Sequence, residues 1–382
     1  MRPLALVLLV GLLSGCSLFG DDDNTEPPVK LEAFERRVEL KKIWSRNTGS
    51  GTDKQFIKLV PTLVDGRVYV ADRKGMVSVV ELETGKLVWK KKTGIPISAG
   101  TGVGEGMVLV GSSEGELVAL DAENGEIRWN VEVSSEVLSV PQVFEDVVIV
   151  QTVDGNLTGL NAENGDSIWI HDRSVPVLTL RGTSTPLVQD GVILAGFANG
   201  KMTALETSSG REIWEAAVAV PHGRTELQRI VDLDANPVVH QGILYVTSYQ
   251  GRLMAISLQN GRVLWNRDMS AYAGIAVDNS QVYVSDTDSE VWALDRRSGG
   301  SLWKQGALRR RSLTGPVAID GYVGVGDFEG YLHLLSRLDG SVAGRVRVDS
   351  DGIAATPVTV SGDRLLVLGA GGTLALYQLE PV

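Results

Sequence analysis

The stretch of sequence that decides the fold is residues 115–129, GELVALDAENGEIRW. A glycine opens it, a second glycine follows ten residues later, and a tryptophan lies fourteen residues after the first glycine. The same frame returns about every forty residues. Its instances are Gly75/Trp89, Gly115/Trp129, Gly155/Trp169, Gly200/Trp214 and Gly251/Trp265, with Ser289/Trp303 and Gly330/Gly344 as weaker copies. Self-similarity at this period indicates a solenoid or a propeller.

Each repeat contains four short apolar segments separated by turns. In residues 58–92, the turn sequences Asp65-Gly66 and Glu83-Thr84-Gly85 are typical of β-hairpins. The segments around them are rich in β-branched and aromatic residues, which favour strands. The strands expected in this repeat are 58–64, 67–70, 76–82 and 86–91. Four short antiparallel strands per repeat form a blade of a β-propeller, so we predict an all-β fold.

The number of blades follows from the two ends of the repeat array. Seven copies of the frame, two of them weaker, are followed by a truncated copy, in which residues 357–379 supply three strands and the chain then stops. Residues 38–44 alternate and end in Trp44, which lies 45 residues ahead of Trp89. We therefore predict an eight-bladed propeller over residues 38–382, in which residues 38–44 complete the last blade beside residues 353–379. Closing the ring in this way removes an open sheet edge.

The recurring tryptophans are predicted to be structural. A large ring at a fixed place in the outer strand can pack against the neighbouring blade, and its Nε1–H can reach a backbone carbonyl. An aromatic ligand cage is disfavoured because the rings are spread one per blade. Trp292 lies outside the frame and is the tryptophan to inspect for exposure. The predicted blade-docking residues are Trp44, Trp89, Trp129, Trp169, Trp214, Trp265 and Trp303.

The N-terminus has the features of a lipoprotein signal. A positive charge at Arg2 precedes the apolar run 4–13, which is too short to span a bilayer as a mature helix. Cys16, the single cysteine of the chain, follows Leu13-Ser14-Gly15 and resembles the acylated cysteine of a bacterial lipobox. The alternative is an unused thiol inside a signal peptide. We predict a signal peptide over residues 1–15, and a lipid anchor and flexible tether over residues 16–37.

Composition and residue spacing argue against several functions. The net charge is −11, and removing residues 1–15 takes away Arg2, which gives 35 − 47 = −12. This charge would repel a phosphate backbone, so nucleic-acid binding is not expected. The glycine-rich residues 100–104 are expected to be a turn between strands rather than a dinucleotide loop. Four histidines fall at different phases of the repeat and are expected in loops or at the surface: His171, His222, His240 and His333. No metal, cofactor or catalytic residue is predicted.

The repeat of residues 115–129 resembles that of the quinoprotein alcohol dehydrogenases, which are eight-bladed propellers. Those enzymes hold pyrroloquinoline quinone and Ca²⁺ on the ring axis, with a disulfide of adjacent cysteines that this chain lacks. With the lipobox added, the whole chain is similar to the BamB family of lipoproteins. That resemblance implies a non-enzymatic subunit of the β-barrel assembly (BAM) complex. It implies attachment to the outer membrane, a periplasmic location, and a role in folding and inserting outer-membrane β-barrel proteins.

Two alternatives from other classes remain at the level of sequence. One is a quinone-dependent or sugar-processing propeller enzyme, which would have a carboxylate-lined axis with a Ca²⁺ site. The other is a scaffold for a different envelope complex. Within the favoured reading, nascent outer-membrane proteins are a further candidate partner, because the many short strand edges could accept an incoming strand.

The partner-binding residues are sought where the repeat is stretched. The distance between successive tryptophans rises from 40 residues to 45 before Trp214 and to 51 before Trp265. The extra residues fall in two links, 175–182 and 222–234, which mix leucine with arginine and aspartate as protein interfaces do. The resemblance implies contacts with BamA by Leu178, Leu180, Arg181, Asp232 and Asp234. The alternative is that the leucines face inward and Arg181 is a solvated or core-pairing charge.

Overall fold

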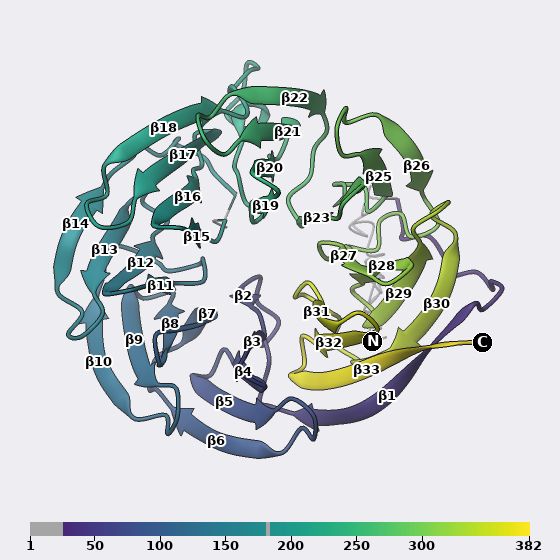
Figure 1. The fold of residues 1–382 in the computed structure, drawn as a ribbon, viewed down its shortest axis with the longest axis horizontal. Helices are drawn as coiled ribbons and strands as arrows, with labels where there is room; N and C mark the ends of the chain where they lie inside the picture. The colour runs from purple at the N-terminus through teal and green to yellow at the C-terminus, as the bar shows by residue number, and fades with distance from the viewer. Residues whose placement is uncertain (1–25, 181–183) are drawn as a thin grey trace, which may run out of the picture.

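The computed structural model describes residues 26–180 and 184–382, so Cys16 and Arg181 lie outside the described residues. The described strands form eight sheets arranged as a ring (Figure 1), which confirms the predicted eight-bladed β-propeller. Seven of these sheets are four-stranded, and one has a fifth strand. Within the described part of the chain, no helix is long and apolar enough to cross a membrane.

The blades are numbered here in chain order, each running from its inner to its outer strand. Blade one contains β3 (Thr62–Val64), β4 (Arg67–Ala71), β5 (Met76–Glu81) and β6 (Leu87–Lys92). Blade two contains β7 (Ile97–Gly104), β8 (Met107–Ser112), β9 (Glu116–Asp121) and β10 (Ile127–Glu132). Blade three contains β11 (Gln142–Phe144), β12 (Val147–Gln151), β13 (Leu157–Asn161) and β14 (Ser167–His171). Blade four contains β15 (Leu187–Gln189), β16 (Val192–Gly196), β17 (Lys201–Glu206) and β18 (Glu212–Ala217).

The remaining blades follow the same plan. Blade five contains β19 (Val238–His240), β20 (Ile243–Thr247), β21 (Arg252–Ser257) and β22 (Val263–Asp268). Blade six contains β23 (Ile275–Val277), β24 (Gln281–Ser285), β25 (Val291–Asp295) and β26 (Ser301–Gln305). Blade seven contains β27 (Val317–Ile319), β28 (Tyr322–Gly326), β29 (Tyr331–Ser336) and β30 (Val342–Arg347). Blade eight contains β31 (Val358–Ser361), β32 (Arg364–Leu368), β33 (Thr373–Pro381) and the N-terminal β1 (Val38–Asn47).

Strand burial follows position in the blade. The second and third strands, such as β8 and β9, are buried along most of their length because each blade packs between two neighbours. Their sequences are therefore nearly continuous apolar runs. The outer strands, such as β10, leave more side chains exposed. The glycine-rich residues 100–104 lie inside β7 rather than in the predicted turn, because β7 extends over eight residues with two register shifts against β8.

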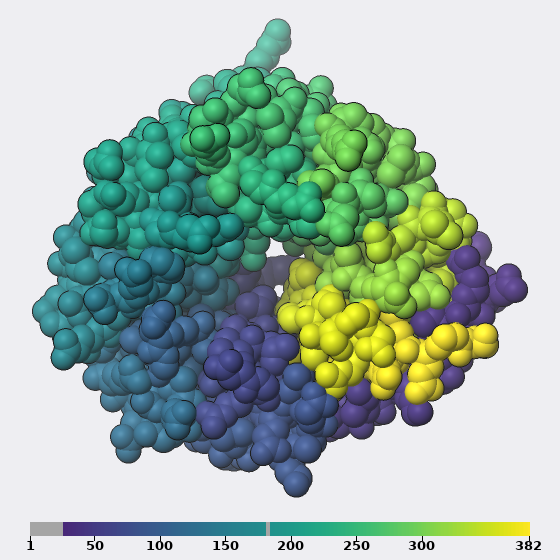
Figure 2. All heavy atoms as spheres, in the orientation of Figure 1, coloured from purple at the N-terminus to yellow at the C-terminus, as the bar shows by residue number. Residues whose placement is uncertain are grey.

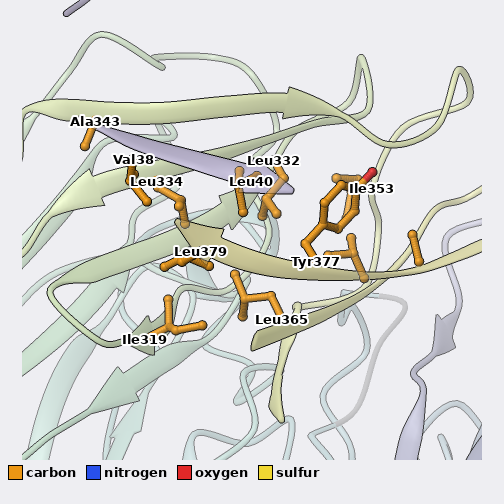
Figure 3. Close-up of a cluster of buried hydrophobic side chains, with 12 residues drawn as sticks. Val38, Leu40, Ile319, Leu332, Leu334, Ala343, Ile353, Leu365, Tyr377 and Leu379 are labelled. Atoms are coloured by element: carbon orange, nitrogen blue, oxygen red, sulfur yellow. The ribbon is translucent and has the colours of Figure 1, made fainter. Parts of the chain in front are cut away.

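The ring closes through the N-terminal strand. β1 pairs antiparallel with β33 from Val38 opposite Pro381 to Asn47 opposite Thr373, three residues longer than predicted. Val38 and Leu40 lie in one apolar cluster with residues of blades seven and eight (Figure 3). β1, in purple, and the C-terminal β33, in yellow, therefore lie side by side on the rim (Figure 2).

Each outer tryptophan contacts the next blade in the same way. A register shift between outer and third strands precedes Trp129, and the same shift recurs in the other blades. Such a bulge turns the side chain toward the neighbouring blade. There the indole Nε1–H of Trp129 donates to the carbonyl of Ala162 at 2.9 Å, and the ring covers Gly165, where a Cβ would lie 3.0 Å from it. The seven tryptophans Trp44, Trp89, Trp129, Trp169, Trp214, Trp265 and Trp303 all donate to a carbonyl of the next blade at 2.8–3.1 Å.

The missing tryptophan of blade seven has a structural reason. Its position is Gly344, where a Cβ would lie 2.9 Å from the Val38 side chain. The outer strand of the next blade is β1, which enters from the N-terminus and brings Val38 to the place that an indole occupies elsewhere. Trp292, the tryptophan outside the frame, is half-buried, with Arg267 and Lys304 over its ring and its Nε1–H donated to Asp286 at 2.8 Å.

The connections between blades share one face of the ring. Each link from an outer strand to the next inner strand lies beside a hairpin between second and third strands. Backbone hydrogen bonds join them, as in Val137 to Ser112, Ala271 to Ser248 and Ile353 to Asp327. We call this side the link face. The hairpins that carry Gly125, Gly165 and their equivalents join third and outer strands, so the antiparallel order of each sheet places them on the opposite face.

Candidate functional site

The first stretched link begins after β14 and leads into blade four. Val177 is 94% exposed and Leu178 is 38% exposed, while Leu180 is half-buried. Val177 and Leu178 therefore face solvent. The prediction for Arg181 concerns a residue outside the described part of the chain.

The second stretched link, residues 218–237, leads into blade five. It contains the short 3₁₀ helix η1 (Leu227–Arg229), and Leu227 is 65% exposed. The side-chain amide of Gln250 donates to the Leu227 carbonyl at 3.3 Å, which ties this turn to a hairpin of blade five. Beyond η1 the chain runs inward, and residues 230–235 are buried.

Asp232 joins the two stretched links. Its carboxylate Oδ2 accepts a hydrogen bond from the backbone N–H of Leu180, and its own carbonyl accepts from the N–H of Tyr249 at 3.0 Å. The structure thus brings Leu180 and Asp232 together, 52 residues apart in sequence. The buried carboxylate fixes the backbone from which Leu178 is presented.

A third link reaches the same place. β2 (Lys58–Leu59) lies between blades eight and one in the chain but pairs in parallel with β7 of blade two. Lys58 Nζ donates to the carbonyl of Asp234 at 2.5 Å, across 176 residues of sequence. Phe56, two residues earlier, is 96% exposed. Three links from distant parts of the chain therefore meet at Lys58, Asp232 and Asp234, which we call the link cluster.

Burial controls the charges of the link cluster. Loss of solvation, with a smaller contribution from the neighbouring Asp234, raises the pKa of Asp232 to about 7. Loss of solvation also raises the pKa of Asp234 and lowers that of Lys58 to about 8. Within the described residues, Oδ1 of each aspartate is buried without a hydrogen-bond donor. The cluster is therefore sensitive to protonation near neutral pH.

The burial of the aspartates changes one expectation. Asp232 and Asp234 were predicted as interface charges, yet they are 1% and 7% exposed. Both carboxylates lie behind the surface. The Asp232 carboxylate accepts from the Leu180 N–H, whereas Asp234 accepts from Lys58 through its backbone carbonyl. The exposed apolar side chains of the two stretched links include Val177, Leu178 and Leu227. Lys58 and Phe56 are not among the predicted residues. A signal for them was present in the sequence. Trp44 and Trp89 are 45 residues apart, the same stretched spacing that located the link before Trp214.

One histidine also departs from expectation. His333 is fully buried on β29, where its Nε2 contacts Asp327 Oδ2 at 2.9 Å. It was expected in a loop or at the surface because histidine alone on a strand carries no signal of a buried partner. Among the described residues, no three His, Cys, Asp or Glu side chains group as a metal site would require.

The fold and repeat define the class of protein, an eight-bladed propeller built from repeats like those of quinoproteins. A family model described as outer membrane protein assembly factor BamB matches residues 73–305. The chain is 48% identical over 376 residues to BamB of Pseudomonas aeruginosa and 51% identical over 374 residues to BamB of Marinobacter adhaerens. These alignments cover 98% of this chain in both cases, and 98% and 95% of the relatives.

Solved structures agree with this assignment. BamB from Moraxella catarrhalis matches with a TM-score of 0.81 at 30% identity, covering 89% of this chain and 99% of the other. The chain belongs to the BamB family, a family of assembly factors rather than enzymes. The quinohemoprotein alcohol dehydrogenase from Comamonas testosteroni matches with a TM-score of 0.70, covering 89% of this chain and 76% of the enzyme, but at only 14% identity. That likeness shows the fold alone.

Proposed function

We propose that this protein is a lipid-anchored subunit of the BAM complex that binds BamA through the link face. In this proposal residues 1–15 are a signal peptide and Cys16 carries the acyl chains that hold the propeller at the outer membrane, facing the periplasm. The membership of the chain in a family named for outer membrane protein assembly supports this role.

The observation that carries the BamA proposal is the combination of exposed apolar side chains with a fixed backbone. Val177, Leu178 and Leu227 are exposed on links that Asp232 and Lys58 hold in place. Side chains presented from a rigid backbone lose less conformational entropy on binding, which favours affinity. Apolar groups beside an arginine such as Arg181 are typical centres of protein interfaces.

Binding at this face would hold the periplasmic domains of BamA in one orientation relative to the propeller. Such a role needs no catalytic group. It supports the folding and insertion of outer-membrane β-barrel proteins by positioning the subunit that inserts them.

A second role rests on the outer rim. Ile168 and Ile170 on β14 are 47% and 63% exposed, and β14 is an outer edge of its sheet. An extended segment of a nascent outer-membrane protein could add to such an edge by backbone hydrogen bonds. Site-specific crosslinking from position 170 to nascent chains tests this role, and capture of no nascent chain would remove it.

The BamA proposal is tested by a triple change of Leu178, Leu180 and Arg181 to alanine in the full-length lipoprotein. We expect loss of co-purification with BamA and an unchanged circular dichroism spectrum. A matched control is Leu338→Asp, because Leu338 is 91% exposed on the opposite face of the ring. Undiminished co-purification of the triple variant would overturn the assignment of the surface.

A further inference from the structure

Residues 26–37, predicted as the end of a flexible tether, instead lie against blade seven, and we call them the strap. In Figure 1 the strap is the purple segment outside β30. The N–H of Val29 donates to the carbonyl of Arg309 at 3.1 Å, and Nη1 of Arg311 donates to the carbonyl of Val29 at 3.1 Å. Leu31 packs against the apolar cluster that contains Leu308 and Leu313.

A second group of contacts holds the C-terminal half of the strap. Arg345 donates to the carbonyl of Glu32 at 3.2 Å, and its guanidinium lies 4.9 Å from the centre of the Phe34 ring. The N–H of Arg37 donates to the carbonyl of Ala343 at 2.9 Å. Main-chain and side-chain contacts thus alternate along the strap, which fixes its register on the blade.

Both strap-binding arginines belong to a buried polar network. Arg311 is 3% exposed, and its Nε donates to Asp327 Oδ2 at 2.8 Å. Arg345 Nε donates to His333 Nδ1 at 3.0 Å, so the hydrogen of the neutral imidazole is on Nε2, where it is donated to Asp327. Burial lowers the pKa of His333, in agreement with the neutral form. Residues outside the strap therefore also hold the two guanidinium groups in place.

The contacts also give the direction of the strap. Arg309 and Arg311 lie in the link between β26 and β27, on the link face, and they contact Val29. Ala343 lies near the start of β30, beside the hairpin of the opposite face, and it contacts Arg37. The strap thus runs from the link face to the opposite face, where β1 begins. The described part of the strap therefore begins on the link-face side of the ring.

We propose that the strap orients the anchored propeller so that its link face is directed toward a lipid surface. The inference rests on the lipid anchor at Cys16 in the proposed function. Cys16 and Glu26 are ten residues apart, a distance that an extended chain spans in at most about 35 Å. If the strap were free, attachment would begin at Val38 on the opposite face. The tether would then be about 22 flexible residues with a root-mean-square reach of roughly 26 Å, which would not favour one face of the propeller over the other at the membrane.

The orientation is measurable because Cys16 is the single cysteine of the chain and is consumed by acylation. One added cysteine can therefore carry a fluorescent donor. Asp288 and Arg297 are exposed on blade six, Asp288 on the link face and Arg297 on the opposite face. We expect higher energy transfer from position 288 than from position 297 to acceptor lipids in vesicles of phosphatidylethanolamine and phosphatidylglycerol. Equal transfer in membrane-bound protein would overturn the proposal.

Variants of the strap separate its contribution from other causes. Replacing residues 29–34 by a glycine-serine sequence of equal length should abolish the difference between positions 288 and 297. Phe34→Ser should reduce the difference without touching the apolar core, and the unfolding midpoint checks the fold of both variants. A difference that persists in the glycine-serine variant would show that the strap is not its cause.

Two further measurements keep the failures distinguishable. The first is flotation with vesicles, which measures membrane binding. The Cys16→Ser variant is its control, because only this variant is expected to lose flotation. Absence of flotation in the unaltered lipoprotein would remove the anchor itself, whereas flotation without an energy-transfer difference removes only the orientation. Hydrogen exchange of residues 29–37 should be slow in the full-length protein, and immediate exchange would contradict docking of the strap.

Discussion

The belt of outer tryptophans and the link cluster are built in opposite ways. Each tryptophan docks on the next blade with one indole hydrogen bond over one glycine, and the contact is repeated seven times. The link cluster exists once, contains two aspartates and a lysine, and joins three links that are distant in sequence. A repeated apolar contact distributes stability around the ring. The buried polar contacts of the link cluster shape one surface only, the surface at which we propose that the partner binds.

The largest effect should follow from damage to the belt. Trp129 is 8% exposed, and Trp129→Ala should lower the free energy of unfolding by about 3–5 kcal/mol, because it removes a buried aromatic side chain and its hydrogen bond. Chemical denaturation measures this change. The fraction that remains folded should still bind BamA, and a loss of binding without a loss of stability would break the distinction between belt and cluster.

A smaller effect on stability and a larger one on binding should follow from Asp232→Ala. The change removes the acceptor of the Leu180 N–H, a loss worth about 1–3 kcal/mol, which loosens the link that carries Leu178. We expect BamA affinity to fall by about tenfold, equivalent to about 1.4 kcal/mol. Asp232→Asn, which keeps an acceptor oxygen, should restore most of the affinity. Binding by surface-based kinetics and the unfolding midpoint are measured together, and equal defects in both variants would argue against the positioning role.

The smallest effect is a dependence of stability on pH. Because the pKa of Asp232 is raised to about 7, the folded protein binds a proton that the unfolded chain releases near pH 4. Its contribution therefore makes the protein less stable as pH rises, by about 1.4 kcal/mol between pH 6 and pH 8. Lys58, with a pKa of about 8, acts in the opposite direction near pH 8.

The difference between the unaltered protein and Asp232→Asn isolates this carboxyl group. Unfolding free energies at pH 6, 7 and 8 should show the variant gaining stability relative to the parent as pH rises. Parallel curves would mean that Asp232 stays charged across this range, and the link cluster would then lose its sensitivity to protonation.

The fold was predictable because its information is local and repeated. The glycine-tryptophan frame, the hairpin turns and the orphan strand at residues 38–44 were sufficient for eight blades and the closure of the ring. The site was predictable only in part. The stretched spacing located two links, but it did not separate exposed Leu178 from buried Asp232, because a link has no strand period that assigns its side chains to an inner or outer face.

The sequence by itself determined the repeat, the number of blades and the family, because the strands and turns of each blade are encoded within about forty consecutive residues. Only the tertiary structure showed which distant residues meet at the link cluster and along the strap. Lys58 meets Asp234 across 176 residues, and Arg311 meets Val29 across 282 residues. Such contacts depend on how the ring closes in space, so no local pattern records them. Gly344 combines the two kinds of information. The repeat in the sequence shows that a tryptophan is absent at this position, and only the packing of Val38 against Gly344 in the structure explains why.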